Sequence, residues 1–171
     1  PDLESVKKVC ETSDIEERLL TSVESPIVLL RKKVGTDSGL SEECAAGNPY
    51  LGIMLPYSPL HHIIMRSINI PVIATSGNIS EEPICTDEDT AFKKLGGIAD
   101  YFLVHNRKIM RHVDDSIARI ISGREMIIRR ARGYAPLPIQ AEGLKESVFA
   151  AGAHLKNTIA VNKDNNIFIS Q

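Results

Sequence analysis

The sequence predicts an α/β domain built on an open, twisted mixed sheet with flanking helices. Two observations predict this fold class. Short runs rich in β-branched and apolar residues alternate along the chain with amphipathic segments of helical period. Two such runs, 117–121 and 126–128, are joined only by Ser122-Gly123-Arg124-Glu125, which indicates a turn between antiparallel strands. A sheet that combines helical crossovers with such a hairpin is mixed.

Composition indicates an ordinary globular chain. It has 171 residues, of which 43% are hydrophobic and 25% charged, and its net charge is −2. Cys10, Cys44 and Cys85 are far apart and form no CxxC pair, so we expect neither a disulfide framework nor a zinc finger. The first residues lack the apolar core of a signal peptide, and no apolar run approaches membrane-spanning length. We therefore expect a cytoplasmic protein with no membrane partner; the start at Pro1 suggests a fragment.

The N-terminal part is expected to be structural. Asp2 is placed to cap a first helix, and Ser13 with Glu16 forms the capping-box pattern of a second. The apolar run 27–30 predicts a core strand. Residues 34–48 contain several glycines and polar residues, so an irregular surface loop is expected there.

The next strand is predicted at residues 50–55, followed by a helix with Ser58 as its cap and Pro59 in its first turn. This helix carries two consecutive histidines. His61 and His62 point about 100° apart on a helix, so they are poorly placed to bind one metal ion. His61 lies near the helix start and is a candidate ligand contact. The alternative is a histidine whose partners all lie within the protein.

A small polar loop is the first candidate binding site. Residues 70–74 are typical of a buried strand, and the loop follows directly. Gly77 and Asn78 tolerate positive φ, which allows a sharp turn with exposed N–H groups. Ligands of open α/β sheets bind at such strand ends, although an ordinary turn has the same composition. A helix capped by Thr86 and a strand at 98–104 are expected downstream. The four predicted loop residues are Thr75, Ser76, Gly77 and Asn78.

Positive charge is concentrated in residues 105–136, although the whole chain is slightly acidic. Eight basic residues stand against three acidic ones there, and seven of the eight are arginine. Arginine suits bidentate recognition of phosphate or carboxylate, so an anion site is expected; the alternative is a solvated strand face. Because side chains alternate along a strand, we expect Arg129 to face the ligand and Arg130 to pair with Asp114 or Asp115.

The neighbouring carboxylates Asp114 and Asp115 have two interpretations. They are suitable ligands for Mg²⁺ beside a nucleotide. Aspartates among arginines are more often ion-pair partners that hold the arginines in position. We favour the second interpretation and assign no metal ligand in this chain.

A change of composition at residues 136–147 predicts a domain boundary. An extended exit leads into the polar stretch 140–147, and residues 148–171 then form a strand, turn and strand with little core of their own. An isolated hairpin is marginal in water, so this unit is expected to belong to a larger domain. The predicted organisation is a domain at 1–139, a linker at 140–147 and a hairpin at 148–171.

Four blocks of the sequence resemble, in the same order, the YrdC-like domain of the HypF family of hydrogenase-maturation carbamoyltransferases. They are LGIMLPYSPLHHIIM, IPVIATSGNISEEPI, IADYFLVHNRKIMRHVDDSIARII and MIIRRARGYAPLPI. The tail GAHLKNTIAVNKDNNIFISQ resembles the opening hairpin of the sugar-kinase/actin-like carbamoyltransferase domain that follows in this family. The resemblance implies a YrdC-like adenylate-forming domain at 1–139, without its N-terminal part, and a truncated carbamoyltransferase domain from 148.

The resemblance implies that the full protein uses ATP and carbamoyl phosphate to make a carbamoyl-adenylate. The carbamoyl group is then passed to the C-terminal cysteine of the partner protein HypE and becomes a cyanide ligand of nickel–iron hydrogenase. The cofactor implied is ATP, and Mg²⁺ is left open. The residues that match the family's adenylate loop are Thr75, Ser76 and Asn78, and those that match its nucleotide cavity are Ser116 and Arg129 or Arg130.

Several parts of the family's sequence pattern precede the matched blocks. They are a glycine-rich opening, a basic stretch that helps to bind nucleotide phosphates, an acylphosphatase-like domain and zinc fingers. None of them is present in this sequence. Zinc is therefore expected only in the upstream region of the parent protein, and we expect the chain alone to be inactive.

Two alternative functions share this fold. One is a threonylcarbamoyl-adenylate synthase of tRNA modification, against which the tail after Pro138 argues. The other is an RNA-binding module, because YrdC-like domains present a basic concave face. A net charge of −2, four phenylalanines and four tyrosines give little support for nucleic acid as a partner.

Overall fold

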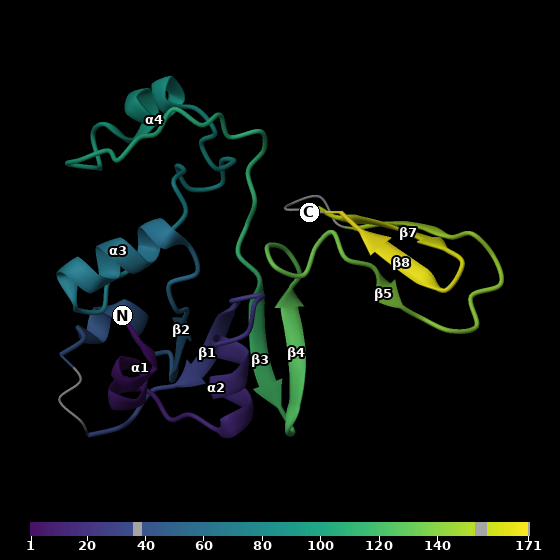
Figure 1. Ribbon diagram of the computed structural model, residues 1–171, viewed down its shortest axis with the longest axis horizontal. Coiled ribbons are helices and arrows are strands. Elements are labelled where there is room, and N and C mark those ends of the chain that lie inside the picture. The colour runs from purple at the N-terminus through teal and green to yellow at the C-terminus, as the bar shows by residue number, and fades with distance from the viewer. Residues whose placement is uncertain (36–38, 153–156, 171) are drawn as a thin grey trace. The chain divides into compact units, whose positions relative to one another are not determined.

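The computed structural model describes residues 1–35, 39–152 and 157–170 (Figure 1). It divides into two compact units, Ile73–Asp114 and the remainder, which comprises Pro1–Val72 and Asp115–Gln171. The elements in chain order are α1 (Leu3–Val9), α2 (Asp14–Leu20), β1 (Ile27–Arg31), the 3₁₀ helix η1 (Glu42–Ala45), β2 (Tyr50–Ile53), α3 (Pro59–Ile68), α4 (Glu88–Leu95), β3 (Ile117–Ile121), β4 (Arg124–Arg129), β5 (Ile139–Gln140), β6 (Phe149–Ala151), β7 (Ile159–Lys163) and β8 (Asn166–Ile169).

The larger unit contains the predicted mixed sheet, with strand order β2-β1-β3-β4 (Figure 1). β1 is antiparallel to β2 and parallel to β3, and β3 is antiparallel to β4. Fully buried side chains of β1 and β3 pack with apolar residues of α1 and α2 to form the core. The α/β fold class is thus confirmed. The buried core residues are Val6, Val9, Cys10, Leu19, Leu20, Val28, Leu30 and Ala118.

Helix starts were predictable because capping is local chemistry. The Asp2 carboxylate accepts the Ser5 N–H at 2.8 Å, the Ser13 capping box is present, and Ser58 caps α3 with Pro59 in its first turn. One predicted cap is wrong by one residue. Asp87, and not Thr86, caps α4, and its carboxylate accepts the N–H of Thr90 at 2.8 Å. A carboxylate is also favoured there by the helix dipole.

The hairpin between β3 and β4 is tighter than predicted. Ser122 and Gly123 both have positive φ, 51° and 74°, which is the geometry of a two-residue turn with mirror-image backbone. Arg124 and Glu125, which the sequence assigned to the turn, are therefore the first residues of β4. The described residues of the segment 34–48 are mostly irregular, as expected, apart from η1; residues 36–38 lie outside the described residues.

Two predicted strands do not form. The segments 70–74 and 98–104 pair with no other strand among the residues that the structure describes. Val72 and Ile73 are 51% and 80% exposed, so the first segment is not a buried strand. β-branched composition favours extended backbone, but a strand exists only where a neighbour satisfies its N–H and C=O groups. In the described residues of the smaller unit, α4 is the only regular element.

The C-terminal segment forms a second, antiparallel sheet with order β5-β8-β7-β6 (Figure 1). The expected hairpin is present as β7 and β8, but it is not isolated, because β5 and β6 extend it. Gln140, the first residue of the predicted linker, already pairs in this sheet. Buried Asn162 binds the backbone of residues 146–148. Its Nδ2 donates to the Glu146 carbonyl at 2.8 Å, and its Oδ1 accepts the Val148 N–H. The domain limits 1–139, 140–147 and 148–171 stay a prediction.

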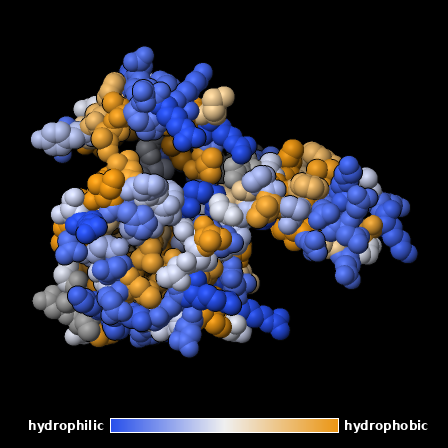
Figure 2. Space-filling model, viewed as in Figure 1, coloured by the Kyte–Doolittle hydropathy of each residue, from blue (hydrophilic) through white to orange (hydrophobic). Residues whose placement is uncertain are grey.

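One face of this second sheet is apolar and exposed. Phe149, Val161 and Phe168 lie in register on three neighbouring strands, and all three are exposed. Figure 2 shows apolar side chains at the surface of this sheet.

No helix in the described part of the chain has the length and apolar character needed to cross a membrane.

A single glycine allows the segment before β1 and the segment after β4 to approach closely. Gly133 has φ +89°, and a Cβ there would lie 2.3 Å from the Glu24 carbonyl oxygen. We expect Gly133→Ala to lower the free energy of unfolding by about 3 kcal/mol or more, because steric overlap adds to backbone strain. Gly123→Ala is the matched control, since Gly123 also has positive φ but open space around it. It should lose only about 1–2 kcal/mol in the same urea titration. Equal losses would contradict the close approach.

Candidate functional site

The predicted loop Thr75-Ser76-Gly77-Asn78 lies in the smaller unit. Its first three residues are exposed and Asn78 is half-buried. The Gly77 carbonyl accepts the Cys85 N–H at 2.9 Å, which closes the loop. Neither Gly77 nor Asn78 has a positive φ, so the expected turn geometry is wrong; in this segment the left-handed residue is Glu81, with φ 66°. The loop is ordered by hydrogen bonds and not by the freedom of its glycine.

Asn78 is the residue of this loop with an unsatisfied polar atom. Its amide nitrogen donates to the Ile79 carbonyl at 2.8 Å, whereas its Oδ1 is buried and accepts no hydrogen bond from any described residue. Burying an acceptor without a partner is unfavourable by about 1–3 kcal/mol. Such an atom therefore indicates a place where a donor from a ligand or water would be stabilising.

Ser116 lies at the entry to β3 and is completely buried. Its hydroxyl donates to the Arg132 carbonyl at 2.8 Å and accepts the Ala131 N–H at 2.7 Å. Its carbonyl accepts the Ile27 N–H at 2.8 Å. Ser116 thus joins the start of β1 to the segment that leaves β4. Its predicted contact with a nucleotide stays a prediction.

Arg129, expected to face the ligand, and Arg130, expected to pair with an aspartate, lie at the end of β4. Arg129 is the last residue of the strand and is half-buried. The Arg130 guanidinium donates through Nη2 to the carbonyls of Tyr134, at 2.8 Å, and Leu137. Its Nη1 is buried and has no hydrogen-bond partner among the described residues. Arg130 is therefore held in place by backbone while one of its donor groups remains unused.

The expected ion pair is formed by a different arginine. Arg132 Nε donates to Asp115 Oδ1 at 2.7 Å, so the prediction that Arg130 pairs with an aspartate is wrong for Asp115. Arg130 lies beyond the last residue of β4, where strand alternation no longer determines which way a side chain points. The ion-pair interpretation is confirmed for Asp115.

Arg132 makes several contacts besides this ion pair. Its Nη2 donates to the Ser25 carbonyl at 2.8 Å and its Nη1 to the Glu24 carbonyl at 3.3 Å. Its Cζ lies 3.5 Å from the centroid of the Tyr57 ring, a cation–π contact. Hydrogen bonds therefore hold the edges of the guanidinium group, and the Tyr57 ring covers one of its faces.

Tyr57 also contacts His61, the histidine predicted to reach a ligand. The two ring centroids are 4.6 Å apart at an interplanar angle of 81°, an edge-to-face contact. Burial, followed by the negative charge of Asp115, raises the pKa of Tyr57, so the phenol stays neutral. The His61 imidazole is half-buried and forms no hydrogen bond with any residue that the structure describes. His62 is exposed.

No three histidine, cysteine, aspartate or glutamate side chains gather into a metal-binding group within residues 1–35, 39–152 and 157–170. Of the two aspartates considered as Mg²⁺ ligands, Asp115 forms an ion pair with Arg132.

The comparisons with known proteins agree with this fold. Residues 1–131 match the model of the Sua5/YciO/YrdC family, described as Telomere recombination. The chain belongs to this family. Among curated proteins it is 45% identical to the carbamoyltransferase HypF of Synechocystis sp. over 94% of its length, and 34% identical to the probable carbamoyltransferase HypF of Methanocaldococcus jannaschii over 99%. The resemblance to HypF is therefore confirmed.

Solved HypF structures give the same result. A full-length HypF in a phosphate- and nucleotide-bound form matches 99% of this chain with 48% identity and a TM-score of 0.85, and HypF of T. kodakarensis matches 99% with 41% identity and a TM-score of 0.90. The chain covers 27% and 22% of those two proteins. It likewise spans only about a fifth of the curated relatives, 21% and 22% of their lengths.

Sequence reasoning missed Tyr57 and the anchoring role of Arg132. A cation–π partner 75 positions away in the chain leaves no local pattern, so neither could be found from spacing. The only available signal was their place in the blocks PYSPLHH and RRARGYAP, next to residues already selected.

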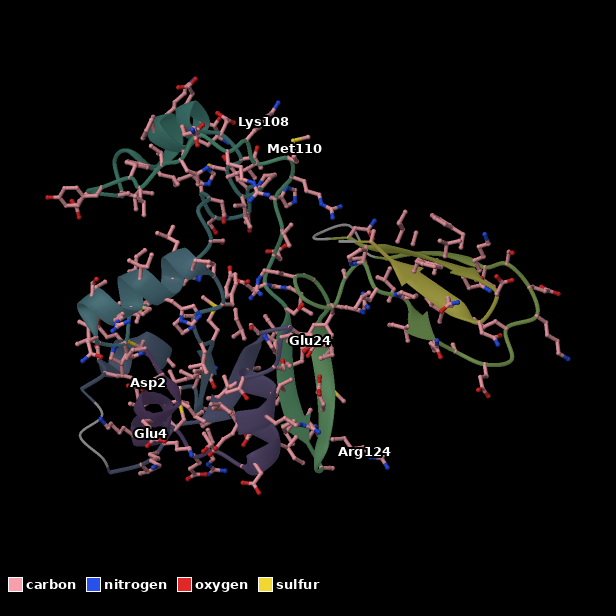
Figure 3. The ribbon with its side chains drawn as sticks, viewed as in Figure 1. Asp2, Glu4, Glu24, Lys108, Met110 and Arg124 are labelled. Atoms are coloured by element: carbon pink, nitrogen blue, oxygen red, sulfur yellow. The ribbon has the colours of Figure 1, made fainter. Side chains whose placement is uncertain are left out.

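We expect Arg132→Lys to lower the free energy of unfolding by about 1–3 kcal/mol, because lysine cannot satisfy the Asp115 carboxylate and two carbonyls together. Arg124→Lys is the matched control. Arg124 is exposed at the tip of the hairpin (Figure 3), and this change should leave stability within about 0.5 kcal/mol. Thermal and urea unfolding of both variants measure the difference. Identical curves would show that Arg132 is not an anchor.

Proposed function

We propose that this chain is the nucleotide-handling part of a HypF-type carbamoyltransferase that acts in nickel–iron hydrogenase maturation. Two sets of observations support this. The chain matches curated and solved HypF proteins over 94–99% of its length, including the tail beyond the YrdC-like region. Of the three buried side-chain polar atoms that lack a hydrogen-bond partner among the described residues, two belong to predicted site residues, Asn78 Oδ1 and Arg130 Nη1.

The proposed reaction joins a carbamoyl group to AMP. Carbamoyl phosphate, ATP and water give carbamoyl-adenylate, pyrophosphate and phosphate. The C-terminal cysteine thiolate of HypE then attacks the carbamoyl carbon, the bond to the AMP oxygen breaks, and a thiocarbamate and AMP result. Charge moves onto the leaving pyrophosphate in the first step, which a guanidinium group stabilises without covalent participation.

The residues of this chain would contribute fixed donors and acceptors. Asn78 Oδ1 can accept an N–H, which both adenine and a carbamoyl group carry. Arg130 Nη1 can donate to a phosphate oxygen, with its side chain already oriented by two carbonyls. We propose that Thr75, Ser76 and Gly77 contact the ligand through the same loop as Asn78. Ser116, Arg129 and His61 stay proposed residues of the nucleotide cavity. A Mg²⁺ ion would be held mainly by the nucleotide phosphates, as is usual for this ion.

The cellular setting follows from the same proposal. A thiolate acceptor and three free cysteines suit a reducing compartment, so we place the protein in the cytoplasm. HypE and the two phosphoryl substrates are its proposed partners.

A threonylcarbamoyl-adenylate synthase is the second candidate, because the matched family model is shared by the whole Sua5/YciO/YrdC family. The acyl donor separates the two. In the full-length protein that carries this segment, carbamoyl phosphate should trigger pyrophosphate release from ATP, and bicarbonate with threonine should not. The opposite pattern would replace the first proposal by the second.

Within that assay, Asn78→Ala should lower kcat/KM for ATP roughly five- to 150-fold, because one positioned acceptor is lost. This corresponds to a loss of about 1–3 kcal/mol of transition-state stabilisation. Asn106→Ala is the control, since Asn106 is an exposed residue of the same unit. It should retain the wild-type rate. Circular dichroism and melting temperature check that both variants are folded, and an unchanged rate in Asn78→Ala would remove this residue from the site.

A further inference from the structure

A continuous chain of contacts runs from the Asp115 carboxylate to the His61 imidazole. Asp115 holds Arg132 at 2.7 Å, Arg132 lies over the Tyr57 ring at 3.5 Å, and Tyr57 meets His61 at a centroid distance of 4.6 Å. All four residues belong to the larger unit. Tyr57 stands directly before the cap of α3, and His61 lies in the first turn of that helix.

The two ends of this chain differ in how well they are satisfied. Arg132 has a partner on all three nitrogens and on its face. The imidazole at the other end has a fixed ring contact but no hydrogen bond to any described residue. A half-buried histidine that is oriented by packing and leaves both nitrogens free is suited to an external partner.

We propose that Tyr57 is a positioning residue, which transmits the rigid Asp115–Arg132 pair to His61 so that the imidazole offers its N–H to a phosphoryl oxygen of a bound substrate. This inference rests on the proposed function, in which both ATP and carbamoyl phosphate carry such oxygens. Tyr57 acts through ring contacts alone, because its hydroxyl forms no hydrogen bond within the described residues. An aromatic ring, and not a phenol, is therefore the required group at position 57.

Tyr50 provides a matched control from the same strand region. Its ring lies under Arg119 at 3.9 Å, so it makes the same type of cation–π contact, but it has no ring contact with any histidine that the structure describes. Replacing Tyr50 or Tyr57 by leucine removes a comparable stacking interaction. Only the change at Tyr57 also removes the ring contact that orients the His61 imidazole.

The test measures KM for ATP and for carbamoyl phosphate in the full-length protein that carries this segment. Tyr57→Leu and His61→Ala should each raise KM for one of the two substrates about tenfold with little change in kcat, as expected for the loss of a hydrogen bond to a charged group made equally in the ground and transition states. The substrate whose KM rises identifies the phosphoryl oxygen. Tyr57→Phe and Tyr50→Leu should keep wild-type KM values for both.

The double variant Tyr57→Leu/His61→Ala distinguishes positioning from a general loss of stability. If Tyr57 acts through His61, the KM of the double variant equals the KM of His61→Ala alone. Multiplicative effects, or a rise in KM with Tyr50→Leu as large as with Tyr57→Leu, would overturn the proposal. If Tyr57→Leu fails to fold, His61→Ala decides alone, and unchanged KM values then overturn it. An inactive wild-type protein would instead reject the proposed function itself.

Discussion

The guanidinium group of Arg132 joins four segments that are far apart in the sequence. It neutralises Asp115 at the entry to β3, binds the carbonyls of Glu24 and Ser25 before β1, and covers the ring of Tyr57 after β2. Gly133 allows this approach, because any side chain there would overlap the Glu24 carbonyl. The surroundings of β1, β2 and β3 at this point therefore depend on one planar cation with five donors.

This anchor changes how the basic segment should be understood. The excess of arginine was attributed to anion binding, yet Arg132 is structural, because all three of its nitrogens have partners within the chain. One nitrogen of Arg130 likewise donates to backbone carbonyls. The carbonyl oxygens carry partial negative charge, so the local field is already partly compensated before any ligand arrives. Arg130 Nη1 is a buried donor without a hydrogen-bond partner among the described residues, which is a more specific feature than a basic patch.

The parts that sequence predicted well depend on local chemistry. Asp2, Ser13 and Ser58 cap helices because a side-chain oxygen three residues before a free N–H is sufficient. The core strand at Ile27 and the hairpin at Ser122-Gly123 are likewise encoded within a few residues. The parts that failed are non-local. Val72 and Ile73 have strand composition, but no strand in the described part of the chain pairs with them. The partner of Asp115 is set by where β4 ends and not by residue type.

The candidate site shows the same division. The loop at Thr75–Asn78 was selected by composition. The structure adds the reason for its interest, which is a buried acceptor on Asn78 that receives no hydrogen bond from the described residues. His61 was selected for its place near a helix start, and the structure adds Tyr57, which composition alone gives no reason to choose. A preorganised site needs groups that are held firmly yet left unsatisfied at one atom. Within the larger unit, Arg130 and His61 each meet that description: two carbonyls hold the Arg130 guanidinium, and a ring contact orients the His61 imidazole. Within the smaller unit, Asn78 meets it through its amide–carbonyl bond to Ile79.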